Sequence, residues 1–487
     1  MNPVRKSMTA EHSTQWNVSN RMNRRDFLKV AGLGAASFAI SGCTSKSLRK
    51  KPNIVFILVD DLGWHQLGCY GSTYYETPNL DRLAKQGMRF TDAYAAAAVC
   101  SPTRASIMTG KYPARLHLTD FIRGRSAKGK KLLTPEWTPY LPLEEVTIAE
   151  VLKKAGYVCG HFGKWHLNKD KNYKPGRPMD PGSQGFDDVL TTHKARKGPP
   201  SPYENDWQHV RQITEHALAF IEKNKDGPFF CYIPHNTIHR PEIEKESLVR
   251  KYRNKPGADN DTEYGHNNPV QAAMLETLDK SVAMVLNKLD ELNLADNTLL
   301  VFFGDNGHLG PKDSKPLRGS KADLYEGGIR EPMIVRWPGV VKPGTTCNVP
   351  VISIDFFPTF LQVVGLKVGE ATVDGQSLLP LLKRTGKPKR DAIYFHYPHY
   401  HDQSIAPSGV VRQGKYKLVE WFEKSIDGIN TPGALELYDL EKDLNEQNNL
   451  APKMPRLAAE LHAKLKKWRK SVGAQEMLRN PGYNPQR

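Results

Sequence analysis

The sequence predicts an α/β fold in which a mostly parallel central sheet is sandwiched by helices, followed by a smaller C-terminal subdomain of an antiparallel sheet plus a helix. Continuous apolar runs of strand length, at residues 54–59 and 298–303, are typical of strands covered on both faces. Helical patterns alternate with such runs, which is the order expected for a parallel sheet. After about residue 385 the pattern changes to short strands split by turns. This change predicts the smaller subdomain.

The large domain is expected to alternate strands and helices along the chain. We expect strands at residues 54–59, 158–162, 229–233, 298–303 and 332–336, and helices at residues 77–84, 147–155, 207–223, 270–292 and 355–364. Pro78 stands in the first turn of its helix, where the missing N–H group costs nothing. Residues 165–205 are rich in Pro, Gly and Lys and indicate a long surface excursion, a kind of loop that often carries function.

The smaller subdomain is expected to hold four short strands and one basic helix. The strands are predicted at residues 394–400, 409–413, 416–421 and 436–438, and the helix at residues 454–471. We therefore divide the chain into a leader at residues 1–43, a polar tether at residues 44–52, a large α/β domain at residues 53–385 and an α+β subdomain at residues 386–487.

The chain carries a formal net charge of +17 with an ordinary hydrophobic fraction of 39%. A basic body favours an anionic ligand, because its field concentrates molecules of opposite charge. The sequence has no zinc-finger spacing, basic zipper or aromatic RNA-binding motif, so we expect no nucleic-acid partner. A basic surface kept only for solubility stays an open alternative.

The leader resembles two bacterial export motifs in succession. Arg24 and Arg25 open Asn-Arg-Arg-Asp-Phe-Leu-Lys, which is similar to a twin-arginine signal, and the apolar run at residues 30–40 is too short to cross a bilayer. Ile-Ser-Gly-Cys at residues 40–43 resembles a lipobox. We therefore expect export across a bacterial inner membrane and a membrane anchor on a lipidated Cys43, in the periplasm or at the cell surface. A plain secretion signal with ordinary cleavage is the alternative, and translation from Met22 is open.

The six cysteines indicate no zinc site and no disulfide framework. None of them has the spacing of zinc ligands. Because twin-arginine export carries proteins that fold in a reducing cytosol, we expect free thiols. Apart from Cys43 and Cys100, we expect buried apolar thiols at Cys69, Cys159, Cys231 and Cys347.

Two pairs of oxygen-bearing side chains follow predicted buried strands. Asp60 and Asp61 follow residues 54–59, and Asp305 and Asn306 follow residues 298–303. Because the carboxyl ends of strands line the ligand crevice of an open α/β sheet, the two pairs are expected to meet around one ion. Carboxylates and a carboxamide without imidazole suit a hard cation, Ca²⁺ ahead of Mg²⁺.

Cys100 opens the segment Cys-Ser-Pro-Thr-Arg after a run of small residues. Pro102 stands where the first turn of a helix would lie, and Arg104 shares the helical face of Cys100. We therefore expect Cys100 at a helix N-terminus, where N–H groups and the helix dipole favour an anion such as sulfate. A buried cysteine that only opens a helix is the alternative.

This Cys-x-Pro-x-Arg core is similar to the signature of the type I sulfatases, which belong to the alkaline-phosphatase-like superfamily. The resemblance implies that a maturation enzyme oxidises Cys100 to formylglycine, the catalytic aldehyde. It also implies a bound calcium that is held by the residue at position 100 together with Asp60, Asp61, Asp305 and Asn306. Arg104 would hold the hydrated aldehyde.

Three further motifs occur in the order that this family shows. Gly-Lys-Trp-His at residues 163–166 implies that Lys164 contacts the sulfate and that His166 orients a hydroxyl of the hydrate. His239 precedes one residue and then proline, as the family's catalytic histidine does, so we expect His235 to be structural. Lys321 matches the family's sulfate-binding lysine. Residues 63–66 and 322–323 depart from the family's usual residues and are expected to shape only the pocket rim.

The implied reaction is hydrolysis of sulfate esters, with sulfated saccharides as the expected partners. One hydroxyl of the hydrated formylglycine, deprotonated toward Asp305, attacks sulfur, and His239, with Lys321 beside it, protonates the leaving alcohol. Lys164, Lys321 and the cation hold the charge on the sulfate. His166 then helps to remove the second hydroxyl's proton, the aldehyde reforms and sulfate leaves.

Two other function classes stay open as alternatives. A phosphomonoester or phosphonate hydrolase of the same superfamily would share the fold and the metal crevice, although the Cys-x-Pro-x-Arg core argues against it. A non-catalytic lipoprotein would bind anionic glycans, although every expected catalytic position is filled. The aromatic and imidazole cluster at residues 396–401 is expected either to flank the pocket and grip a sugar or to pack as a strand and turn.

Overall fold

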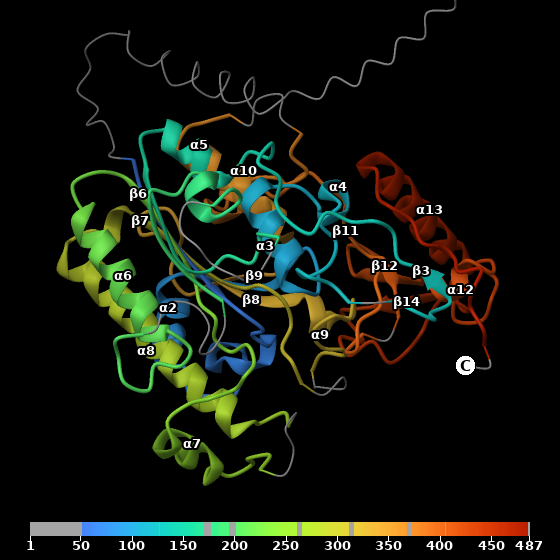
Figure 1. The fold of residues 1–487 in the computed structure, drawn as a ribbon, viewed down its shortest axis with the longest axis horizontal. Coiled ribbons are helices and arrows are strands. Elements are labelled where there is room, and N and C mark those ends of the chain that lie inside the picture. Colours follow the sequence, from blue (N-terminus) through green and yellow to red (C-terminus); the bar gives the residue numbers. More distant parts are fainter. Residues whose placement is uncertain are drawn as a thin grey trace, which may run out of the picture.

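The computed structural model describes residues 51–125, 127–169, 177–193, 201–260, 265–310, 316–367, 372–404 and 406–485. Within them a large mixed sheet crosses the centre of the molecule, and a small sheet lies at one end (Figure 1). The large sheet has the order β10, β2, β8, β7, β1, β6, β4, β5, with β9 beside β2. In this order the strands are Val351–Ile352, Met88–Tyr94, Arg330–Arg336, Thr298–Gly304, Asn53–Val59, Phe229–Pro234, Val158–Lys164 and Asp188–Thr192, and β9 is Thr345–Cys347.

Most neighbouring strands of the large sheet are parallel, as predicted. Strand β1 runs parallel to β6 and β7, and β4 runs parallel to β5 and β6. Strand β8 is antiparallel to both β7 and β2. The carboxyl ends of β1, β7, β6 and β4 therefore meet at one edge of the sheet, which is where an open α/β sheet places its ligands.

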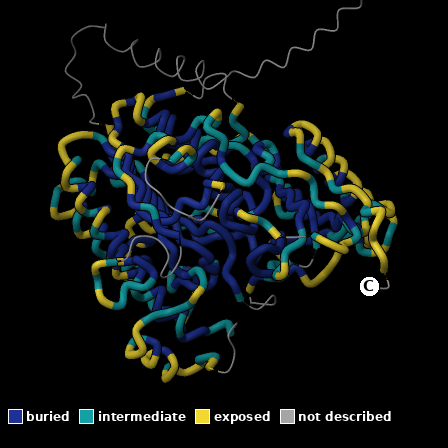
Figure 2. Tube along the Cα trace, in the orientation of Figure 1, coloured by how far each residue is buried: buried dark blue, intermediate teal, exposed yellow. Residues whose placement is uncertain are grey.

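Two hydrophobic cores cover the two faces of the large sheet, because alternate side chains of β1 point to opposite sides. Ile54, Phe56 and Leu58 enter the core that is closed by α3, α5, α10 and α11. Val55 and Ile57 enter the core that is closed by α2, α6, α7 and α8. These helices are Cys100–Thr109, Ile148–Lys154, Phe356–Val363, Leu379–Leu382, Pro78–Gln86, Val210–Lys223, Glu246–Arg253 and Pro269–Glu291. The strands form the buried interior and the outer helix faces are exposed (Figure 2).

Local sequence sets where the main helices begin. In α8 the Asn268 side chain accepts hydrogen bonds from the N–H groups of Val270 and Gln271, at 2.8 and 3.1 Å, and Pro269 takes the first helical position. In α5, Thr147 and Glu150 form a capping box. These caps satisfy N–H groups that the helix itself leaves unpaired.

The small antiparallel sheet has the order β11, β12, β13, β14 and packs against one long helix, α13. Its elements are Ala392–Tyr397, Ser408–Gln413, Tyr416–Trp421, Leu435–Asp439 and Pro455–Val472. Helix α13 lies along this sheet (Figure 1), and a third hydrophobic core lies between them. The α/β class and the added antiparallel sheet plus helix are confirmed. The boundary proposed at residues 385 and 386 lies between α11 and β11.

Short elements connect the larger ones. In the described part of the chain they are the helices α4 (Pro113–Leu116), α9 (Glu326–Ile329) and α12 (Phe422–Ser425), five single turns of 3₁₀ helix, and the paired strands β3 (Leu132–Leu133) and β15 (Leu478–Arg479).

The prediction of a surface excursion at residues 165–205 is wrong for residues 165–168 and 186–193, whereas residues 201–205 are exposed or half-buried turns, as predicted. Trp165, Leu167 and Phe186 are buried, and β5 is an edge strand of the large sheet. The reason is that the Pro and Gly residues shape turns around elements that still bury apolar side chains. Residues 170–176 and 194–200 lie outside the described part of the chain.

The cysteine prediction is confirmed for two of the four positions. Cys159 and Cys231 are buried, whereas Cys69 and Cys347 are only half-buried, because each lies in a partly exposed segment at the sheet's flank. Each of the five described cysteines is a free thiol. The predicted twin-arginine signal, lipobox and Cys43 lie outside the described residues, in which no helix is long and apolar enough to cross a membrane.

Candidate active site

The carboxyl ends of β1 and β7 carry the predicted acidic pairs side by side. Asp60 and Asp61 follow β1, and Asp305 and Asn306 follow β7, which pairs with β1 in register from Asn53 to Val59. The N–H group of Asp61 donates to Asp305 Oδ1 at 3.2 Å. All four side chains are buried. Residues more than 240 positions apart in the chain thus share one site.

Cys100 enters this site from the first position of α3. The residue before it, Val99, has an extended backbone. The helix ends at Gly110, which adopts a left-handed φ of 68° that glycine tolerates because it has no Cβ atom. Cys100 Sγ lies 3.3 Å from Asp60 Oδ1 and 3.9 Å from Asp61 Oδ1. One ligand atom from each of Asp60, Asp61, Cys100 and Asp305 lies within 4.8 Å of the others. The helix N-terminus therefore places the thiol inside the carboxylate cluster.

Three buried cations compensate the three carboxylates. Arg104 donates to Asp305 Oδ2 through Nε at 2.9 Å and Nη2 at 2.7 Å, while its Nη1 donates to the carbonyl oxygen of Lys164 at 2.6 Å. Lys164 donates to Asp60 Oδ2. Lys321 donates to both carboxylate oxygens of Asp61, at 2.6 and 2.8 Å. Buried charges need such partners, because an unpaired one costs several kcal/mol.

The electrostatics of the cluster separate its carboxylates. Burial works to raise the pKa of Asp60, but Lys164 and the other cations hold this pKa well below its usual range. The pKa of Asp61 is also lowered against burial, chiefly by Lys321. Burial and the charge of Asp60 raise the pKa of Asp305 to about 7, although Arg104 opposes them. Burial and Asp60 also raise the pKa of the Cys100 thiol, which favours its protonated form.

The residues of the cluster fit a hard cation. Asn306 donates through Nδ2 to Asp61 Oδ1 at 2.7 Å, while its own Oδ1 is buried without a hydrogen-bond partner. A buried, unpartnered carbonyl oxygen beside three carboxylates is the donor set that Ca²⁺ and Mg²⁺ prefer. When bound, such a cation would be held by Asp60, Asp61, Asp305, Asn306 and the residue at position 100.

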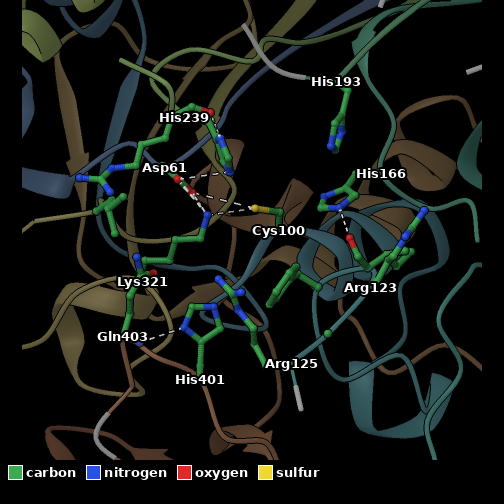
Figure 3. Close-up of a pocket in the computed structure, with 15 residues that line it drawn as sticks. Asp61, Cys100, Arg123, Arg125, His166, His193, His239, Lys321, His401 and Gln403 are labelled. Carbon is green, nitrogen blue, oxygen red and sulfur yellow. Dashed lines mark hydrogen bonds and ion pairs between the residues drawn. The ribbon is translucent and has the colours of Figure 1, made fainter. Parts of the chain in front are cut away.

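The two predicted catalytic histidines lie on different walls of the site (Figure 3). His239 Nε2 lies 3.9 Å from Asp61 Oδ2, and its Nδ1 contacts the carbonyl oxygen of Arg240 at 2.6 Å. His166 Nε2 donates to the carbonyl oxygen of Ile122 at 2.7 Å, which leaves Nδ1 unpartnered. Burial lowers the pKa of His239 to about 4 despite Asp61, and lowers the pKa of His166 well below its usual value.

His235 and Lys164 lie apart from the pocket wall. His235 is buried, and its Nε2 contacts Ser281 Oγ of α8 at 3.3 Å. Strand β4 ends at Lys164, and His166 beyond it has a φ of 58°, so the side-chain alternation of the strand does not extend to His166. His166 lines the pocket, whereas Lys164 does not.

The pocket above the cluster has a volume of about 460 Å³. The predicted site residues Asp61, Cys100, His166, His239 and Lys321 line it. The sequence prediction missed Arg123, Arg125, His193, Arg240 and Gln403, which line it as well. His193 directly follows β5, as Asp60 follows β1, so recognising β5 as a strand would have found it.

The cluster at residues 396–401 divides between packing and the pocket. His396 contacts the carbonyl oxygen of Gln475, and His399 contacts Thr119 Oγ1, each at 2.7 Å. Tyr397 donates to Asp120 Oδ1 at 2.9 Å. His401 alone of the cluster lines the pocket. Tyr397 and His399 therefore join the small subdomain to the large domain, whereas His396 packs within the small subdomain.

Comparison with known proteins gives a consistent result. Residues 52–366 match the family model Sulfatase, and residues 320–471 match the model for the C-terminal part of N-sulphoglucosamine sulphohydrolase. The chain is 32% identical to Arylsulfatase A of Homo sapiens over 83% of this chain and 84% of that protein. It is 30% identical to a Sulfatase of Formosa agariphila over 93% of this chain and 94% of that protein.

Solved structures agree in fold. The crystal structure of Ps i-CgsB in complex with k-i-k-neocarrahexaose is 26% identical, has a TM-score of 0.70, and is matched over 89% of this chain and 95% of that one. A Bacteroides thetaiotaomicron sulfatase structure from work on glycosaminoglycan metabolism is 25% identical, has a TM-score of 0.67, and is matched over 86% of this chain and 100% of that one. The chain belongs to the sulfatase family, within the alkaline-phosphatase-like superfamily, and is a sulfuric ester hydrolase.

Proposed function

We propose that this protein removes sulfate esters from sulfated carbohydrates by means of a formylglycine made from Cys100 and a calcium ion. The observation that carries the proposal is the position of Cys100, at a helix N-terminus, 3.3 Å from Asp60 and 3.5 Å from Lys321 Nζ. Two similar structures support the carbohydrate part of the proposal. Ps i-CgsB was solved in complex with k-i-k-neocarrahexaose, and the Bacteroides thetaiotaomicron sulfatase comes from work on glycosaminoglycan metabolism.

The surroundings of Cys100 favour conversion of the thiol over its direct use. Burial and the Asp60 charge raise the thiol pKa, so at neutral pH the protonated form, a poor nucleophile, prevails. In formylglycine the sulfur is replaced by oxygen, and Sγ here stands where a hydroxyl of the aldehyde hydrate would lie. Such a hydrate has a second hydroxyl that expels the sulfate after transfer, whereas a serine ester would persist.

The residues around position 100 have separate tasks in this reaction. Lys321 lines the pocket and brings positive charge to the sulfate oxygens, whereas Lys164 adds its charge from behind the wall through Asp60. Arg104 holds Asp305 in place. His239 Nε2 lies 3.9 Å from Asp61 Oδ2, and its Nδ1 donates to the carbonyl oxygen of Arg240. The charge of a bound sulfate raises the lowered pKa of His239, so that Nε2 carries the proton which it gives to the leaving alcohol. A bound cation would polarise the sulfate and favour the deprotonated nucleophile.

His166 is the residue that we assign to recovery of the aldehyde. The bond from its Nε2 to the Ile122 carbonyl oxygen fixes the neutral tautomer whose Nδ1 is an acceptor. This free Nδ1 accepts the proton of the second hydroxyl, the C–O bond to the sulfate breaks, and sulfate leaves with that electron pair while the aldehyde C=O forms.

The test begins with the residue at position 100. Protein co-expressed with a formylglycine-generating enzyme should carry the aldehyde at Cys100 in peptide mass spectra and should release sulfate from sulfated saccharides. Matched phosphate esters should be turned over far more slowly. Full activity in protein whose Cys100 is an unmodified thiol would overturn the mechanism, and a preference for phosphate esters would favour the phosphohydrolase alternative.

We propose further that the protein is an exported lipoprotein anchored through Cys43. The support is the succession of a twin-arginine motif, a short apolar run and a lipobox in residues 23–43. Metabolic labelling with a clickable fatty acid should tag the wild type and not Cys43→Ala. Replacing Arg24 and Arg25 by lysine should leave precursor in the cytoplasm, and unchanged export of that variant would contradict a twin-arginine route.

A further inference from the structure

The pocket carries positive charge that the proposed reaction does not use. Lys321 has a role in the proposed reaction and is bonded to Asp61. Arg123 and Arg125 have no role in that reaction, and they lie exposed on the pocket wall. Arg123 has no hydrogen-bond or ion-pair partner among the residues that the structure describes. Arg125 Nη2 pairs with Asp402 Oδ2 at 3.2 Å, and both side chains are mostly exposed, at 51% and 72%.

The segment that carries these arginines is fixed to the reaction centre. The N–H group of Ile122 donates to Ser101 Oγ at 3.1 Å, and its carbonyl oxygen accepts the bond from His166 Nε2. Ser101 is the neighbour of Cys100 at the start of α3. Residues 121–125 therefore keep a set position relative to the sulfate-binding end of the pocket.

Side-chain packing directs Arg125 toward the pocket. Its guanidinium lies over the Phe121 ring, with 5.6 Å between the guanidinium carbon and the ring centroid. The Phe121 ring also meets the His401 ring, with 5.4 Å between centroids. In Figure 3, Arg125 lies beside His401, and Arg123 lies on the side of His166. The two arginines thus flank the opening above Cys100.

We propose that Arg123 and Arg125 form a second-anion subsite, which binds another sulfate or a carboxylate on the saccharide whose sulfate ester is cleaved. This inference rests on the proposed function and names its substrate class as saccharides with at least two acidic groups. Guanidinium groups suit both anions because their planar fork donates two parallel hydrogen bonds.

In the free protein, the Arg125 guanidinium forms an ion pair with the Asp402 carboxylate. An exposed ion pair contributes only about 0–1 kcal/mol, so an incoming anion displaces the Asp402 carboxylate at little cost. Removing the Asp402 charge should therefore strengthen binding of a second anion. This sign separates a subsite from a surface ion pair that only supports the fold, since loss of such a pair would strengthen nothing.

The experiment compares substrates that differ in one acidic group. Activity is measured on 4-nitrophenyl sulfate, a monosulfated disaccharide, the same disaccharide with a second sulfate, and a sulfated disaccharide that contains a uronate. For Arg125→Ala, kcat/KM on the doubly charged sugars should fall at least about tenfold more than on the monosulfated one, chiefly through KM, as expected for a lost charged hydrogen bond. Arg123→Ala should act in the same direction, and the difference should shrink at high salt.

The Asp402→Asn variant should lower KM for the doubly charged sugars about two- to fivefold relative to the monosulfated one, which corresponds to an exposed ion pair. Arg456→Ala and Asp391→Asn are the matched controls, because they remove the same charges from exposed positions outside the pocket. Both should leave the substrate ratios unchanged. The uronate and disulfate arms show which anion the subsite prefers.

Equal loss on singly and doubly charged substrates in Arg125→Ala, or no preference of the wild type for a second acidic group, would overturn the inference. If the wild type cleaves 4-nitrophenyl sulfate but no saccharide, the proposed carbohydrate function fails instead. In that case inhibition of 4-nitrophenyl sulfate hydrolysis by the same saccharides still measures the subsite, with the same expected ratios.

Discussion

His239 and His235 follow the same strand, and their surroundings give them different roles. His239 is half-buried in the pocket near Asp61, whereas His235 contacts Ser281 in the core under α8. His239→Ala should lower turnover of an alkyl sulfate about 10²–10⁴-fold, the usual effect of a lost general acid. The loss should shrink on an aryl sulfate, whose leaving group needs less protonation.

His235→Ala provides the comparison for this prediction. It should show a smaller defect without dependence on the leaving group, together with a lower melting temperature, because it leaves a core cavity beside Ser281. A leaving-group-dependent loss in His235→Ala, without one in His239→Ala, would reassign the acid.

A second prediction at the residue scale concerns the metal. Asp305→Asn removes a charged ligand while keeping the shape beside Arg104, and Asn306→Ala removes the unpartnered carbonyl oxygen. Both variants should lose bound calcium, measured by elemental analysis of dialysed protein, and Asp305→Asn should lose turnover almost completely. Chelation of the wild type should have the same effect and be reversed by added Ca²⁺. Full activity after exhaustive chelation contradicts a catalytic cation.

At the scale of elements, glycines allow the loop that carries Lys321 to pack against the loop that follows β7. A Cβ atom on Gly328 would lie 2.0 Å from the carbonyl oxygen of Asp323, and one on Gly307 would lie 1.9 Å from that of Gly327. These are close approaches of backbone to backbone, which only glycine permits. The packing of these two loops therefore requires glycine at positions 307 and 328.

Gly328→Ala should therefore shift the turn at residues 318–328 and move Lys321 away from Asp61. Turnover should fall at least about tenfold, since a displacement of about 1 Å can cost about 10² in rate. The melting temperature should fall too, because overpacking costs about 1–3 kcal/mol. Gly386→Ala is the control, since its nearest neighbouring atom would lie 3.7 Å away. Equal behaviour of the two variants would contradict this packing argument.

How far the sequence predicts an element depends on whether its burial leaves a local pattern. Strands β1 and β7 are predicted because both of their faces are buried, which needs a continuous apolar run. Strand β2 went unrecognised because Arg89 and Asp92 interrupt its apolar pattern. Their partners are distant in the sequence: Arg330 of β8 pairs with Asp92, and Arg89 donates to the carbonyl oxygen of Cys69. Strand β5 went unrecognised because turn residues surround it and only part of it is buried.

At the scale of the whole molecule, the floor of the site follows from sequence and its rim does not. Asp60 and Asp305 are predictable because strand ends of one sheet must converge. Arg125 and His401 reach the pocket through contacts between distant segments, such as the bond from Ile122 to Ser101 and that from Tyr397 to Asp120. Such contacts leave no periodic pattern in the sequence, so the residues of the pocket rim cannot be predicted from it.

A buried charge cluster joins the large domain to the small sheet. Lys417 Nζ of β13 lies 2.9 Å from Glu326 Oε1 and 2.9 Å from Glu446 Oε1, and all three side chains are fully buried. Glu446 Oε2 also accepts the N–H group of Glu326 at 2.7 Å. Lys417 is shared by both carboxylates, but Arg330 Nη1 donates to Glu326 Oε2 alone, at 3.1 Å, which makes their protonation unequal.

The two carboxylates respond in opposite directions. Burial and the charge of Glu326 raise the pKa of Glu446, although Lys417 opposes them. Burial would raise the pKa of Glu326 too, but Lys417, Arg330 and Arg412 lower it. Glu326 therefore adds stability above pH 4.5, the ordinary glutamate value, and loses it only in stronger acid. Glu446 keeps its proton longer in the folded state, so it lowers stability as pH rises above 4.5.

The Glu446→Gln variant should not show the decrease in folding stability that Glu446 causes above pH 4.5. Glutamine keeps an acceptor for the Glu326 N–H group but turns an amide toward Lys417. Because this new contact also changes stability, the stability of the variant at a single pH is not the readout. The readout is the change, between pH 5 and pH 8, in the difference of unfolding free energy between variant and wild type, measured by urea denaturation. It should move in the variant's favour by at least about 1 kcal/mol, since one unit of pKa corresponds to about 1.4 kcal/mol. Glu441→Gln removes the same charge from an exposed position and should show no such change. A pH-independent difference for Glu446→Gln would mean that Glu446 is ionised in the folded protein throughout this range, and that Lys417 balances both carboxylates at once.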